Sequence, residues 1–167
     1  MLSLPSVYLE TTFVSYLTGR ESRDIDILSK QLSCKRWWEV YRNDFQLFVS
    51  EPVIREVSRG DSVAAAERLA VLLGIDVLET TPEAVRLAKE LLTTESVPQK
   101  AVEDALHIAV SASHGMDFLL SLNFRHINNG VRRRKLEQVC ISAGFVLPQI
   151  CTPDELMGED DGELSDS

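Results

Sequence analysis

Residues 101–123 read AVEDALHIAVSASHGMDFLLSLN. The first part, residues 101–114, has the apolar spacing of an α-helix, and Gly115 follows it in the position of a C-terminal helix cap. Residues 118–122 form a short run of mostly apolar side chains, which is typical of a strand buried on both faces. A helix that leads directly into such a strand predicts a parallel sheet covered by helices.

The same alternation continues outward from this stretch. Strands are predicted at residues 6–10, 45–50, 76–79 and 118–122, and residues 145–147 could add a fifth. Helices are predicted from a cap at Thr11 or Thr12 to Leu17, over residues 24–41, 52–60, 61–73, 101–114 and 131–143, and from Thr81 onward. This order predicts an α/β fold: a three-layer sandwich with a central parallel sheet of four to five strands and helices on both faces.

The acidic residues are concentrated at the C-terminus. The chain has 167 residues and a formal net charge of −9. Residues 154–167 hold seven of the 26 acidic side chains and none of the 17 basic ones, so the body keeps 19 acids against 17 bases. We therefore expect one domain, residues 1–153, and an acidic, disordered tail, residues 154–167. The nearly neutral body does not by itself indicate nucleic-acid binding.

The sequence argues against a membrane or secreted protein. It has no run of about 18 apolar residues, and residues 1–5 lack the basic and apolar regions of a secretory signal. The three cysteines, Cys34, Cys140 and Cys151, are odd in number and widely spaced, so they predict no disulfide framework. These features favour a cytoplasmic protein with reduced thiols.

Four polar side chains stand where predicted strands end or helices begin. Glu10 closes the first strand, Asn123 follows the strand at residues 118–122, and Glu56 and Asp104 lie in early turns of helices. The carboxyl ends of parallel strands meet at one edge of a sheet, where open α/β folds build their sites. Several carboxylates in one cleft repel each other, and a hard cation such as Mg²⁺ or Mn²⁺ relieves that repulsion. With such an ion, the pattern suggests hydrolysis of a phosphodiester.

Four blocks of sequence resemble, in the same order, those of PIN-domain ribonucleases. The blocks are YLETT (8–12), EPVIREV (51–57), EDALHIA (103–109) and GMDFLLSLN (115–123). Four blocks in register are a more specific signal than any one of them. The likeness is greatest to VapC-like proteins, the toxin halves of bacterial toxin–antitoxin pairs. RHINN (125–129) and ICTPDELM (150–157) are similar to one subgroup of them.

The resemblance implies a metal-dependent, single-strand-specific endoribonuclease. In that interpretation Glu10, Glu56 and Asp104 hold one or two Mg²⁺ or Mn²⁺ ions, and Asn123 contributes a neutral oxygen or binds a metal-bound water. A metal-activated water attacks the RNA phosphodiester, and the ions stabilise the developing charge. Besides RNA, the implied partners are a cognate antitoxin protein and a second copy of the chain in a homodimer.

Four further side chains are assigned to substrate contact or to support of the ligands. Thr12 follows the first carboxylate closely and could orient a water or the substrate phosphate. His107, one turn after Asp104, could hydrogen-bond that carboxylate or be a core histidine satisfied by backbone. His126 could contact RNA or fix its loop, and Ser121 belongs to the fourth block.

The carboxylates also have plainer interpretations. Glu10 could simply cap the first helix. Glu56 could pair with Arg55 or Arg59 on the surface. Asp104 lies next to an apolar stripe, which is hard to reconcile with a solvated face, whereas the neighbouring Glu103 is expected to face solvent or to support the ligands.

Two features lie outside the four blocks. Trp37 and Trp38 fall inside the period of the helix at residues 24–41, which favours packing in the core or in a dimer over base stacking. Residues 132–135, RRRK, form the densest basic cluster at the start of a helix, where positive charge opposes the helix dipole. This cluster could contact phosphate, or it could be a solvated face or a partner of the acidic tail.

Two positions depart from the pattern of the PIN family. Glu10 stands where that pattern has Asp, and Asn123 is neutral where Asp is common. These departures support an alternative function, a catalytically weakened PIN domain that binds RNA or a protein partner. A phosphatase of the haloacid-dehalogenase type is less favoured, because it needs a nucleophilic Asp and a second Asp two residues later, which residues 10–12 do not supply.

Overall fold

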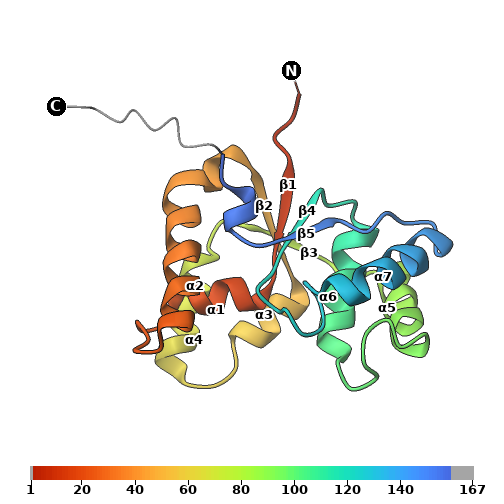
Figure 1. Cartoon of the computed structure of the whole chain (residues 1–167), viewed down its shortest axis with the longest axis horizontal. Coiled ribbons are helices and arrows are strands. Elements are labelled where there is room, and N and C mark those ends of the chain that lie inside the picture. Colours follow the sequence, from red (N-terminus) through yellow and green to blue (C-terminus); the bar gives the residue numbers. More distant parts are fainter. Residues whose placement is uncertain (1, 159–167) are drawn as a thin grey trace.

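Five short runs of mostly apolar residues form one parallel sheet in the computed structural model, which describes residues 2–158 (Figure 1). The strands are β1 (Ser6–Leu9), β2 (Gln46–Ser50), β3 (Asp76–Leu78), β4 (Phe118–Leu120) and β5 (Gln149–Cys151). Their order is β3-β2-β1-β4-β5, and all four neighbouring pairs are parallel. The predicted α/β fold is confirmed, with the larger of the two predicted strand numbers.

Helices cover both sides of the sheet. In Figure 1, α1 (Thr11–Thr18), α2 (Ile25–Arg36) and α4 (Ser62–Val71) lie on one side, and α5 (Pro82–Thr93), α6 (Val102–Ser113) and α7 (Gly130–Ser142) lie on the other. The short helix α3 (Glu51–Val57) contacts both α1 and α6. Within residues 2–158, no helix is long and apolar enough to cross a membrane.

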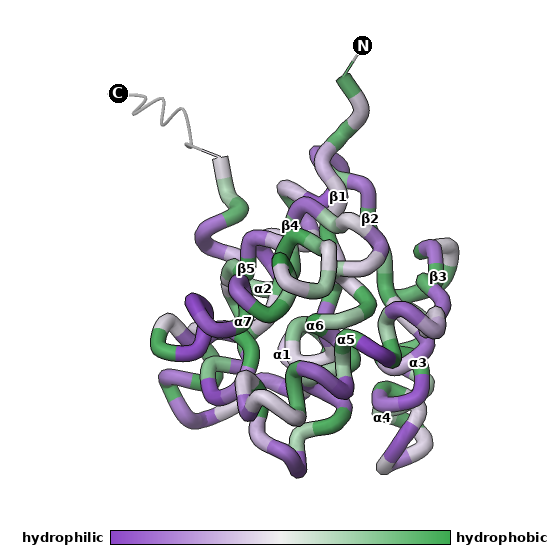
Figure 2. Tube along the Cα trace, turned by 90° about the vertical axis from the view of Figure 1, so that its right-hand side faces the viewer, coloured by the Kyte–Doolittle hydropathy of each residue, from purple (hydrophilic) through white to green (hydrophobic). Residues whose placement is uncertain are grey.

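Polar side chains fix where several helices begin. Asp24, Ser50, Asp61 and Thr81 each accept a backbone N–H from the first turn of the helix that follows. Helix α5 is amphipathic, since Ala84, Leu87, Ala88 and Leu91 are buried on one face of it, and Figure 2 shows hydrophilic and hydrophobic stretches alternating along the helix. Helix α6 is different, because residues 107–111 are fully buried.

The strand order places β1 at the centre and makes its end a natural site. From β1 the chain proceeds to β2 and β3 on one side, and then returns to place β4 and β5 on the other. The direction of winding therefore reverses between β1 and β4, which is where ligands bind in open α/β sheets. Glu10 follows β1 directly, and its backbone N–H donates to the carbonyl oxygen of Leu120 at the end of β4 (3.1 Å).

The predicted fifth strand at residues 145–147 is wrong. Those residues are not part of the sheet, and Val146 is 78% exposed. Pairing starts at Gln149, whose N–H donates to the carbonyl oxygen of Asp117 (3.0 Å). Pro148 has no N–H to donate to a ladder, so β5 forms only beyond it.

The predicted helix over residues 24–41 changes type near its end. Helix α2 ends at Arg36 and continues as one π-helical turn, Trp37–Tyr41. Trp37 is fully buried between the rings of Phe13 (5.5 Å) and Phe45 (5.6 Å), measured between centroids. This tryptophan is therefore a core residue, and the predicted dimer remains a prediction.

The first residues of the predicted acidic tail belong to the fold. Asp154–Leu156 form a short 3₁₀ turn, and Leu156 is buried in the core. Residues 159–167 lie outside the described residues, so the disorder expected for the tail stays a prediction.

Candidate functional site

The four predicted site residues come from four separate elements. Glu10 links β1 to α1, Glu56 lies on α3, Asp104 is in the first turn of α6, and Asn123 follows β4. The structure brings these four residues into two groups. Glu10 and Glu56 both lie near His107, whereas Asp104 and Asn123 are bonded to each other.

Glu10 is a buried carboxylate held by three donors. It is 2% exposed, and its Oε2 accepts from the Thr12 N–H (3.1 Å), the Thr12 hydroxyl and the Ser121 hydroxyl (3.0 Å). Glu10 thereby caps α1, so the predicted cap at Thr11 or Thr12 is wrong. Burial raises the pKa of the Glu10 carboxyl, although His107 and the hydroxyl donors oppose that shift.

Thr12 and Ser121 connect the ends of the two central strands. The Thr12 hydroxyl accepts from the N–H of Leu122 (2.9 Å), and the Ser121 hydroxyl accepts from the N–H of Asn123 (3.0 Å). Each hydroxyl also donates to Glu10, so both hydroxyls are engaged within the protein. Their geometry therefore supports the carboxylate; direct contact with a substrate stays a prediction.

Glu56 turns inward rather than pairing on the surface. Its Oε1 accepts from the Thr11 hydroxyl (2.9 Å) and from Nε2 of His107. Burial tends to raise the pKa of Glu56, but the bond and charge of His107 outweigh it and lower that pKa. The expected alternative, a pair with Arg55 or Arg59, is wrong.

Glu103 takes the two arginines instead. Its carboxylate accepts from Arg55 (3.0 Å) and lies 3.5 Å from Arg59, with its side chain partly buried. This ion pair links α6 to α3 and leaves Glu56 available to the site. Glu103 is thus only partly exposed to solvent, and the other expectation, that it supports the ligands, stays a prediction.

His107 has different partners from those predicted. It bonds neither Asp104 nor backbone: Nδ1 lies 2.7 Å from the Tyr8 hydroxyl, and Nε2 contacts Glu56. The ring is fully buried, and Nε2 is also 3.9 Å from Oε1 of Glu10. Burial alone lowers the pKa of an imidazole, but the bond to Glu56 and the charges of Glu10 and Glu56 raise it here.

Asp104, Asn123 and His126 form the second group. The Asn123 amide donates to Oδ1 of Asp104 (3.0 Å), and its oxygen accepts from the N–H of His126 (3.0 Å). Nδ1 of His126 lies 2.7 Å from Oδ2 of Asp104. A backbone N–H needs an acceptor and a carboxylate needs a donor, so these contacts fix the orientation of the amide. Asn123 therefore meets Asp104 through its N–H, and the predicted role of its oxygen toward a metal ion or a metal-bound water stays a prediction.

Three site residues were missed by sequence reasoning: Tyr8, Thr11 and Ser50. The Tyr8 hydroxyl lies 2.6 Å from Ser50 Oγ as well as against His107. A tyrosine inside a buried strand requires a partner for its hydroxyl, and that requirement was the available signal. Ser50 precedes a helix that begins with Pro52, which was the signal for a cap.

The basic cluster at residues 132–135 is partly used by the fold. Arg132 donates to the carbonyl oxygen of Ser96 (3.3 Å), and Arg133 donates to Oδ1 of Asn128 (2.7 Å). Arg134 and Lys135 are exposed. Contact with phosphate stays a prediction for these two side chains.

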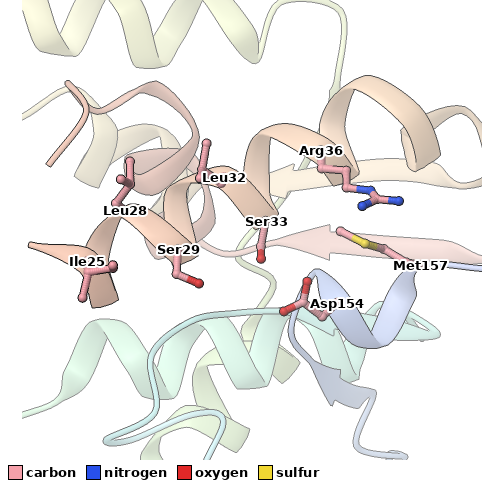
Figure 3. A pocket seen from close by; sticks show the side chains of 8 residues that line it. All are labelled: Ile25, Leu28, Ser29, Leu32, Ser33, Arg36, Asp154 and Met157. Atoms are coloured by element: carbon pink, nitrogen blue, oxygen red, sulfur yellow. The ribbon is translucent and has the colours of Figure 1, made fainter.

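A pocket of about 440 Å³ lies away from the carboxylates, between α2 and the C-terminal segment. In Figure 3, Leu28, Leu32 and Arg36 line it from α2, and Asp154 and Met157 line it from the other side. It contains none of the predicted site residues. The carboxylate groups at the strand ends are therefore a separate site.

The acidic groups match Mg²⁺ or Mn²⁺ in donor type. Among the described residues, Oε1 of Glu10 and Oε2 of Glu56 accept no hydrogen bond, whereas both oxygens of Asp104 do. No three His, Cys, Asp or Glu side chains within residues 2–158 form a ready metal cluster. Mg²⁺ usually keeps several waters and takes only one or two protein carboxylates, so the two unbonded oxygens fit it.

The sequence model of the PIN domain matches residues 7–130, most of the chain. The chain belongs to the PIN-domain family. This result confirms the family predicted from the four blocks, and the PIN match ends just beyond the loop of Asn123 and His126. No curated protein sequence matches this PIN domain.

The solved structures that share the fold of this PIN domain include the following two. One is VapBC2 from Rickettsia felis bound to a promoter DNA fragment, with a TM-score of 0.57 and 13% identity over 88% of this chain and 98% of that one. The other is VapC20 from Mycobacterium tuberculosis, described as a toxin that cleaves the Sarcin-Ricin loop, with a TM-score of 0.54 and 20% identity over 84% and 96%. The predicted sandwich is thus the fold found in VapC structures.

Proposed function

We propose that this PIN domain is a metal-dependent endoribonuclease that hydrolyses phosphodiesters of single-stranded RNA. One observation carries the proposal: Glu10 and Glu56, from different elements, meet at one histidine, while each keeps an oxygen that accepts no hydrogen bond from residues 2–158. Burying a carboxylate such as Glu10 is costly, and functional sites are where such groups concentrate.

The residues divide into ligands and supports. Glu10 and Glu56 would hold Mg²⁺ or Mn²⁺ with Asp104 beside them, and the bound ion would lower the pKa of a water and stabilise charge on the phosphate. Thr12 and Ser121 keep Glu10 in place. His126, whose side chain is 23% exposed, is the residue of this group that we expect RNA to reach.

The VapC structures support a finer proposal, a toxin of a toxin–antitoxin pair. On this proposal an antitoxin protein blocks the carboxylate site, the toxin acts as a homodimer, and both work in the cytoplasm. The support is the shared fold, since identities of 13% and 20% carry no more than that. A neighbouring gene for a small DNA-binding protein would add to it.

The test is cleavage of a mixed set of structured RNAs in Mn²⁺, Mg²⁺ or EDTA. We expect metal-dependent cutting that Asp104→Asn lowers by about a hundredfold or more, since even groups that support metal ligands contribute about 10–100-fold. Glu67→Gln is the control, because it removes an exposed acid on α4 that has no contact with the site. No cutting in any metal by folded protein would favour the alternative, a PIN domain that binds RNA or a protein without cleaving.

A second prediction concerns the neutral residue at position 123. Asn123→Asp replaces the N–H that Asp104 accepts with another carboxylate. In EDTA we expect the free energy of unfolding to fall by about 1–3 kcal/mol, which lowers the Tm. On adding Mn²⁺, the Tm of the variant should rise by more than that of the wild type. Scanning calorimetry measures both, with the exposed Asn43→Asp as control. An unchanged Tm in EDTA would contradict the contact.

A further inference from the structure

A buried chain of hydrogen bonds starts and ends on helix α3. Ser50 Oγ accepts from the N–H of Val53 (3.3 Å) and so caps α3. It lies 2.6 Å from the Tyr8 hydroxyl on β1, which lies 2.7 Å from Nδ1 of His107 on α6. Nε2 of His107 then contacts Glu56, on α3 again. The chain therefore ties together three of the elements that carry the site.

Every polar group in this chain can be satisfied at once. One assignment that satisfies all of them has Ser50 donate to Tyr8, Tyr8 donate to Nδ1 of a neutral His107, and Nε2–H of His107 donate to Glu56. Burial raises the pKa of Tyr8 well above its usual range, so its phenol keeps the proton that it donates. The first three side chains are fully buried, where an unpaired polar group is costly, so the ring of His107 has one favourable orientation.

The two oxygens of Glu56 are used unequally. Oε1 accepts from both His107 and Thr11, and Oε2 accepts from no described residue. Its side chain is only 23% exposed. Metal-ligating carboxylates are commonly held by hydrogen bonds in this way, and here one oxygen is fixed by the protein while the other is left for a ligand.

We propose that His107 is a positioning residue that fixes Oε1 of Glu56 and thereby presents Oε2 to a divalent cation, with Tyr8 and Ser50 fixing the ring. This inference rests on the proposed function, because it concerns the same metal site. The PIN site is then supported by a side-chain network that begins at the cap of α3. His107 touches no reacting atom in this role.

The test compares Tyr8→Phe, His107→Leu and the double variant by the Kd for Mn²⁺, using calorimetry. We expect a several-fold weaker Kd for Tyr8→Phe and about 10–100-fold for His107→Leu. Because Tyr8 acts on the metal site only through His107, adding Tyr8→Phe to His107→Leu should not weaken the Kd for Mn²⁺ any further. His107→Gln should recover part of the affinity, since its amide can donate to Glu56. With RNA, kcat should fall while KM stays unchanged.

Ser111→Ala is the matched control. Ser111 is also fully buried on α6, but its hydroxyl donates to the carbonyl of Ile108 in the same helix. It should lose stability without a change in the Kd for Mn²⁺. Wild-type affinity in folded Tyr8→Phe and His107→Leu would overturn the positioning role alone. A wild-type protein that neither binds Mn²⁺ nor cuts RNA would overturn the proposed function, and this inference with it.

Discussion

Glu10→Gln is expected to yield a protein that is more stable in EDTA but cuts RNA about a hundredfold more slowly or worse. The carbonyl oxygen of Gln can accept from the same donors, Thr12 and Ser121. What is lost is the negative charge, which a metal requires and which burial disfavours. Stability and activity should therefore move in opposite directions, as they do where a strained site is relaxed.

The effect on stability depends on pH in a defined direction. Burial raises the pKa of the Glu10 carboxyl in the folded protein, so the folded state binds that proton more tightly than the unfolded chain. Its unfavourable contribution is therefore complete above the folded pKa and is relieved as pH falls through that value toward about 4.3, the usual pKa of Glu. In Glu10→Gln, the free energy of unfolding should lack this pH-dependent contribution.

Thermal unfolding in EDTA between about pH 5 and pH 8, beside RNA cleavage in Mn²⁺, measures both effects. Glu67→Gln removes an exposed acid and serves as the control for net charge. A lower Tm for Glu10→Gln would show that the buried charge is stabilising. Undiminished cleavage would remove Glu10 from the site.

Trp37→Ala is expected to cost about 3–5 kcal/mol in free energy of unfolding. Trp37 is fully buried, with an edge-to-face contact to Phe13 and a tilted contact to Phe45. Its indole N–H has no partner among the described residues, so the loss reflects packing and the cavity left behind. Trp38 is half-buried and lies 4.5 Å from the guanidinium of Arg42, so Trp38→Ala should cost only about 1 kcal/mol.

Urea unfolding followed by circular dichroism checks the pair, at two protein concentrations. A cost below about 1 kcal/mol for Trp37→Ala would contradict the packing described for the core. If Trp38→Ala instead causes the larger loss, and the loss depends on concentration, Trp38 lies in a dimer interface.

The elements of the fold could be predicted where local pattern decides them. The spacing of residues 101–114 and the apolar run at 118–122 depend on nearby side chains alone. Both elements formed, with shorter bounds than predicted: the helix is Val102–Ser113 and the strand is Phe118–Leu120. The fifth strand could not be placed this way. Residues 145–147 are apolar, but a strand beside β4 must also form backbone hydrogen bonds, and Pro148 has no N–H to donate. Pairing with β4 therefore begins at Gln149.

The site shows the same division. Three carboxylates and Asn123 could be selected as candidates, because the four blocks that contain them follow the order of the family pattern. The hydrogen-bonding partners of these residues could not be predicted. Spacing along one helix places Asp104 one turn before His107 and so suggests a bond between them. In the structure His107 bonds Glu56 and Tyr8, which come from other elements, and how those elements pack against α6 cannot be read from the spacing within α6.

The central place of β1 has a consequence for a chain made from its N-terminus. Glu10 is synthesised early, but the Ser121 that holds it comes 111 residues later, with β4. Until then β1 is an outer strand of the growing sheet, and one edge of its apolar residues, Val7–Leu9, remains unpaired. A nascent chain on the ribosome therefore contains Glu10 before the residues that complete its site have been made. A strand that is paired on both sides in the finished protein therefore keeps an open edge until β4 has been made.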